Sequence, residues 1–66
     1  MQILINDTPI VCGEKTTLTQ LLAQEGIQPT NIAIAMDNVV IPKVQWDTTC
    51  PKENSNIIII KAVQGG

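Results

Sequence analysis

The chain has 66 residues, a formal net charge of −2 and no His. This length suits a single domain, spanning residues 1–66, with a thin core. Without His, both zinc binding and acid–base catalysis near neutral pH lack their usual side chain. The chain has one Trp, no Phe and no Tyr, and its basic residues are scattered singly as Lys15, Lys43, Lys52 and Lys61. We therefore expect a protein that is not an enzyme, holds no cofactor or metal and binds no nucleic acid.

No stretch approaches the roughly 20 apolar residues that cross a bilayer, and the N-terminal segment lacks the features of a signal peptide. We expect a soluble protein, without membrane contact, in the cytoplasm; the sequence does not separate bacterial cytoplasm from plastid stroma. Cys12 and Cys50 could form a disulfide, but in a reducing compartment they are better interpreted as small, buried or half-buried apolar residues.

The N-terminal third predicts a hairpin followed by a helix. Alternating residues over 1–5 and 8–12 predict two strands, and Asn6-Asp7 supplies the turn between them. Thr17, followed three residues later by Gln20, fits a helix capping box. Leucines at positions 18, 21 and 22 form one apolar face, and Gly26 is a natural residue to end the helix, which we expect over 18–25.

Three further strands are expected in the remainder of the chain. Residues 32–36 alternate large and small apolar side chains, and 39–41 continue after a turn at Asp37-Asn38 until Pro42 ends the strand. Residues 43–56 predict a surface loop with one helical turn, in which Trp46 anchors the core or its rim. Four successive isoleucines, Ile57–Ile60, predict a strand that is apolar on both faces.

This order of elements predicts the α+β class, with one helix packed on one face of a mixed sheet of four to five strands. The isoleucine strand would lie centrally, parallel to the first strand, because the connection between them is long and contains the helix.

The isoleucine strand also suggests an interaction surface. If Ile57 and Ile59 face the helix, Ile58 and Ile60 point away from it, and with Val63 they would form an apolar partner interface. A covering loop or a dimer contact at the same place is the alternative.

The sequence then runs through Gln64 to Gly65-Gly66, which we expect to be a flexible tail over 64–66. Glycine lacks Cβ, so such a tail is slim enough to enter a narrow channel in another enzyme. There the Gly66 carboxylate could be activated by ATP and attacked by a sulfur nucleophile. The alternative is an inert tail.

The whole chain resembles the thiamine-biosynthesis sulfur carrier family, ThiS, whose members have the ubiquitin-like β-grasp fold. The segments that carry the resemblance are 1–4 with Asn6, 17–18 with 21–22, 33–35, 40–43 with Trp46, and 62–66. The resemblance implies that Gly66 is adenylated and converted to a thiocarboxylate that donates sulfur to thiazole synthase. Implied partners are a ThiF-type adenylyltransferase, a ThiG-type thiazole synthase, and a sulfur donor such as a cysteine desulfurase.

Three other functions stay open at this point. The same fold serves the small subunit of molybdopterin synthase, although such carriers tend to be longer than this chain. It also serves ubiquitin-like protein modifiers. A pure binding module with an inert tail is the third alternative.

Overall fold

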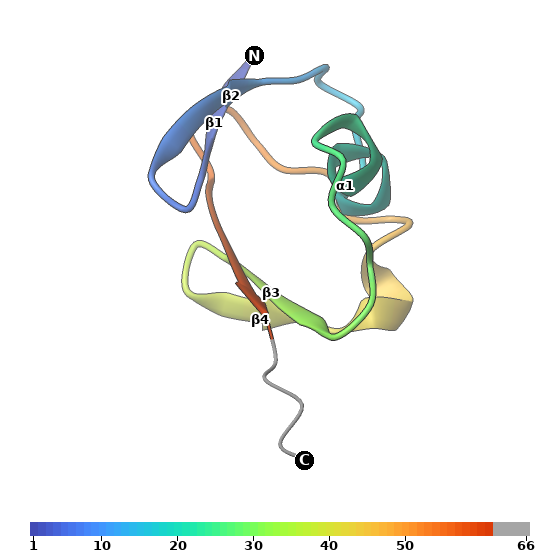
Figure 1. Cartoon of the computed structure of the whole chain (residues 1–66). Coiled ribbons are helices and arrows are strands. Elements are labelled where there is room, and N and C mark those ends of the chain that lie inside the picture. Colours follow the sequence, from blue (N-terminus) through green and yellow to red (C-terminus); the bar gives the residue numbers. More distant parts are fainter. Residues whose placement is uncertain (62–66) are drawn as a thin grey trace.

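The computed structural model of the chain describes residues 1–61, and in it five strands form one mixed sheet with helix α1 on one face (Figure 1). The strands follow the order β2-β1-β5-β3-β4 across the sheet. The elements are β1 (Gln2–Ile5), β2 (Thr8–Val11), α1 (Leu18–Gln24), β3 (Ile32–Met36), β4 (Val39–Ile41), the 3-10 helix η1 (Lys43–Gln45) and β5 (Asn56–Lys61). Each predicted strand is present, and the predicted helical turn is η1.

Two antiparallel hairpins, β1–β2 and β3–β4, form the two sides of the sheet. Their two-residue loops are Asn6-Asp7, with φ of 48° and 68°, and Asp37-Asn38, with φ of 50° and 71°. Positive φ at both loop residues is the pattern of a type I′ turn, whose twist matches that of the flanking strands. Asn and Asp adopt this left-handed backbone more readily than other residues, so the sequence of both loops accounts for their conformation.

Strand β5 fills the gap between the two hairpins. It runs parallel to β1, with Leu4 opposite Asn56, and antiparallel to β3, with Ile32 opposite Lys61. The predicted central, parallel placement of the isoleucine strand is therefore confirmed. A strand with neighbours on both sides and a helix over one face buries the side chains on that face and leaves those on the other face without a covering helix.

Residues within and next to helix α1 cap it at both ends. The Thr17 hydroxyl accepts a hydrogen bond from the Gln20 N–H at 3.1 Å, and the Thr17 N–H donates to Gln20 Oε1 at 3.0 Å. At the other end Gly26 has φ of 69°, and the Ile27 N–H donates to the Leu22 carbonyl oxygen at 2.8 Å. This is a Schellman ending, which satisfies carbonyl groups that the helix leaves unpaired. Within residues 1–61 no helix has the length and apolar character needed to cross a membrane.

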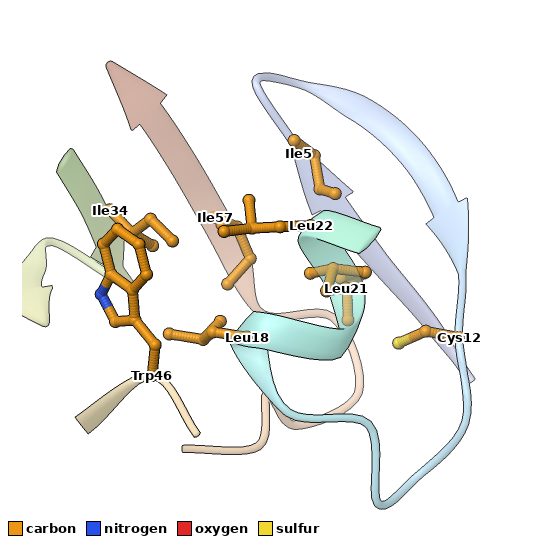
Figure 2. Packing of buried hydrophobic residues seen from close by; sticks show 9 residues of the cluster. Ile5, Cys12, Leu18, Leu21, Leu22, Ile34, Trp46 and Ile57 are labelled. Atoms are coloured by element: carbon orange, nitrogen blue, oxygen red, sulfur yellow. The ribbon is translucent and has the colours of Figure 1, made fainter. Parts of the chain in front are cut away.

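The core lies between α1 and the sheet. Figure 2 shows the helix leucines directed at side chains from β1, β3 and β5. The buried cluster comprises Ile3, Ile5, Cys12, Leu18, Leu21, Leu22, Ile34, Trp46 and Ile57. The Trp46 indole N–H donates to the Ile41 carbonyl oxygen at 2.9 Å, so its polar atom is satisfied although the ring is buried.

The expectation that both cysteines are buried or half-buried is right for Cys12 and wrong for Cys50. Cys12 is buried as predicted, but Cys50 is exposed, and both are free thiols. The neighbouring Pro51 takes the buried position instead, so the chain directs Cys50 outward. There its Sγ lies 3.6 Å from the Lys15 carbonyl oxygen.

Candidate functional site

The candidate site is the face of the sheet opposite helix α1, together with the end of β5. Along β5, Ile57 is completely buried, whereas Ile60 is 58% exposed. Ile59 packs against the core cluster and Ile58 is half-buried. Alternation of side chains along a strand explains the contrast between four identical residues. The structure thus places Ile58 and Ile60 on the face away from the helix, and their contact with a partner stays a prediction.

Small residues of β3 leave these isoleucines uncovered. Ala35 pairs with Ile58 and Ala33 with Ile60, and directly paired residues share a face of the sheet. On the far side Ala35 pairs with Val40 of β4, which is 69% exposed. Sequence reasoning missed Val40 and left open which side of β3 is buried; the alternation of large and small residues over 32–36 is the signal that could have identified the open side.

The same face continues over β1 and β2. Leu4 pairs with Pro9, and Gln2 pairs with Val11, which is 74% exposed. The outward positions of the five described strands form what we call the open face: Gln2, Leu4, Pro9, Val11, Ala33, Ala35, Val40, Asn56, Ile58 and Ile60. None of these side chains is charged. A continuous uncharged, largely apolar face of this kind is typical of a surface that another protein covers.

The end of β5 adjoins a pocket of about 380 Å³. The loop that follows α1 and the start of β3 form its wall, and Lys61 is the one charged residue among the described residues that line it. The predicted site residues Val63, Gln64, Gly65 and Gly66 follow Lys61 and lie outside the described residues. Their roles, and the flexible tail over 64–66, therefore stay predictions.

Two carboxylates, those of Asp47 and Asp37, join loops to the elements beside them. Asp47 Oδ1 accepts from the Thr19 hydroxyl at 2.5 Å, which joins the loop after η1 to helix α1. Asp37 Oδ1 accepts from the Asn56 N–H at 2.8 Å, which joins the β3–β4 turn to the start of β5. Over residues 1–61 no group of three or more His, Cys, Asp or Glu side chains is placed to hold a metal ion.

Comparison with known proteins gives a consistent result over the full length of the chain. The model of the ThiS family matches residues 2–66. The sulfur carrier protein ThiS of Escherichia coli (strain K12) is 29% identical over 66 residues, and the match covers the whole of both chains. The crystal structure of a thiamine biosynthesis protein (ThiS) from Geobacter metallireducens superposes with a TM-score of 0.87 at 20% identity, again over both entire chains. The predicted α+β class of β-grasp type is confirmed by this structural match.

Proposed function

Because the chain belongs to the ThiS family, we propose that it is a sulfur carrier in the synthesis of the thiazole part of thiamine. The observation that carries this proposal is the extent of the family match, which runs through Gly65 to Gly66. The name of the Escherichia coli relative, a sulfur carrier matched from end to end, gives further support.

In the proposed reaction the reactive group is the Gly66 carboxylate. A carboxylate is a poor electrophile because its negative charge is delocalised over both oxygens. Attack of a carboxylate oxygen on the α-phosphorus of ATP would release pyrophosphate and leave an acyl adenylate. The persulfide sulfur of the donor would then attack the acyl carbon and displace AMP, which gives an acyl disulfide. A thiol would reduce this disulfide and leave the thiocarboxylate. Dividing a difficult exchange into two easier steps is the general advantage of a covalent intermediate.

The folded body would serve as the handle by which other enzymes hold this carboxylate. A ThiF-type adenylyltransferase would activate it, a donor such as a cysteine desulfurase would supply sulfur, and a ThiG-type thiazole synthase would receive it. The open face supports this role because it is uncharged and includes Ile58 and Ile60, which lie a few residues before Gly66 in the sequence. The chain itself would act as a protein cosubstrate. A reducing cytoplasm suits its two free thiols.

Intact mass spectrometry tests the proposal directly. The chain is incubated with a ThiF-type adenylyltransferase, MgATP, a cysteine desulfurase, cysteine and a thiol reductant. The expected product is heavier by the difference between one sulfur and one oxygen atom. The matched control is the chain lacking Gly66, which keeps every described residue and should give the same unfolding curve but no mass gain.

Two results would contradict the proposal. The full chain could gain no sulfur and release no pyrophosphate, or the chain lacking Gly66 could gain the same mass as the full chain. Isopeptide-linked products in a lysate would indicate a ubiquitin-like modifier instead.

A further inference from the structure

Strands β1 and β5 run side by side, but β5 continues after β1 has ended. The Leu4 N–H donates to the Ser55 carbonyl oxygen, and the Asn6 N–H donates to the Ile57 carbonyl oxygen, both at 2.9 Å. The main chain then turns away at Asn6, where φ is 48°. The last part of β5 keeps β3 on one side and loses β1 on the other.

The Asn6 side chain takes the place of the missing strand. Its Oδ1 accepts a hydrogen bond from the Ile59 N–H at 2.9 Å, and its Nδ2 donates to the Ile59 carbonyl oxygen at 3.3 Å. If β1 continued, the regular parallel pattern would have the Ile59 N–H donate to the main-chain carbonyl oxygen of residue 6. One side-chain amide thus satisfies both polar groups of one peptide residue on the side that β1 has left.

This contact lies near the C-terminal end of β5. Ile59 stands two residues before Lys61, the last described residue, and Ile58 and Ile60 of the open face flank it. Within residues 1–61, no strand other than β1 borders β5 on this side. The Asn6 amide therefore holds β5 two residues before its end at Lys61.

We infer that Asn6 is a positioning residue, whose side-chain amide fixes the end of β5 and thereby the direction in which the chain continues toward Gly66. The part of this inference that concerns transfer rests on the proposed function. The Asn6 side chain bonds to the main chain of Ile59, which takes no part in the proposed reaction. It acts by keeping Ile59 paired, so that the strand is already ordered when an activating enzyme binds.

Asparagine suits this task for two separate reasons. It tolerates the left-handed backbone of the turn, and its amide carries one acceptor and one donor, which match the N–H and C=O of Ile59. Glycine would keep the backbone and lose both bonds. Aspartate would keep the acceptor and lose the donor. We call the two hydrogen bonds between the Asn6 side chain and Ile59 the bridge. The two substitutions therefore distinguish the effect of Asn6 on the turn from its effect on the bridge.

Amide hydrogen exchange measures the bridge itself. In Asn6→Gly the Ile59 amide should exchange about tenfold faster, as expected when a net hydrogen-bond contribution of usual size is lost. The Ile58 amide points to β3 and should change less than about twofold, because alternate amides of a strand face opposite neighbours. Asn38→Gly is the matched control. It makes the same replacement in the other hairpin, at φ of 71°, and should leave Ile59 unchanged.

If Asn6→Gly speeds amide exchange throughout the molecule, Asn6→Asp provides the test of the bridge. Its carboxylate still accepts from the Ile59 N–H, so Ile59 should stay within about threefold of the parent. Unchanged Ile59 exchange in Asn6→Gly would overturn the inference. So would an equal loss of protection in both variants.

The positioning role is measured with a ThiF-type adenylyltransferase and MgATP, by pyrophosphate release. For Asn6→Gly we expect kcat/KM to fall about tenfold, mainly through KM, because the enzyme must order the strand end as it binds. Asn38→Gly should match the parent. Faster Ile59 exchange with an unchanged kcat/KM would overturn the positioning role. If the parent itself releases no pyrophosphate, the proposed function fails, and the bridge is judged by hydrogen exchange alone.

Discussion

Four consecutive isoleucines with different surroundings offer a direct test of how β5 is placed. We predict that Ile57→Ala strongly lowers the free energy of unfolding, whereas Ile60→Ala lowers it little. The two substitutions remove the same atoms from the same strand. Only the face of the sheet differs, so the difference between them reports the orientation of β5.

The magnitudes follow from burial. Ile57 is 0% exposed, so removing three carbon atoms loses about 2.4 kcal/mol of transfer free energy, at about 0.8 kcal/mol for each. The cavity that remains raises this to about 3 to 4 kcal/mol. Ile60 is 58% exposed, so the same calculation gives about 1 kcal/mol, without a closed cavity. A chain of 66 residues has a total stability of roughly 3 to 10 kcal/mol, so Ile57→Ala removes a large share of it.

Urea unfolding followed by the fluorescence of Trp46 measures both values, because this buried residue is the single Trp of the chain. If Ile57→Ala does not fold, Ile57→Val should fold and should lose about 1 kcal/mol. Equal losses for the two alanine variants, or a larger loss for Ile60→Ala, would refute the assigned orientation of β5 and with it the open face.

Three further predictions concern the helix ends and the open face. Thr17→Ala removes the capping box and should cost about 1 kcal/mol, seen as a fall in Tm of about 4 to 8 °C, while Thr30→Ala in an exposed loop should leave Tm unchanged. Gly26→Ala places a Cβ at φ of 69° with no heavy atom within 4 Å, so urea unfolding should show only the backbone strain, about 1 kcal/mol. Ile60→Asp should keep the fold but raise the KM of the adenylyltransferase for the carrier about tenfold or more, because binding would bury an unpaired charge; an unchanged KM would show that the enzyme does not cover this part of the open face.

Much of the fold was predictable because local signals agreed with the packing. The capping box at Thr17 and the glycine at Gly26 mark the ends of α1 in the sequence itself. Both hairpin loops carry Asn and Asp, the residues that their backbone needs. The isoleucine run left few places for β5 except the centre of the sheet.

The sequence was less informative where the outcome depends on contacts between distant segments. Cys50 and Pro51 are neighbours of similar size, and only the packed structure shows that Pro51 takes the buried position. Val40 joins the open face because Ala35 lies beside it, which depends on strand register. The bridge from Asn6 to Ile59 joins residues 53 positions apart, so no local pattern indicates it.

The central place of β5 also bears on how the protein is made. A ribosome synthesises β5 after the other four strands, and until then the two hairpins have no strand between them to join them into one sheet. Ile57, at the middle of the core, is missing for the same period. A chain still being synthesised therefore lacks the central strand that joins the two halves of its sheet. Partner enzymes that recognise the folded protein would not bind such incomplete chains.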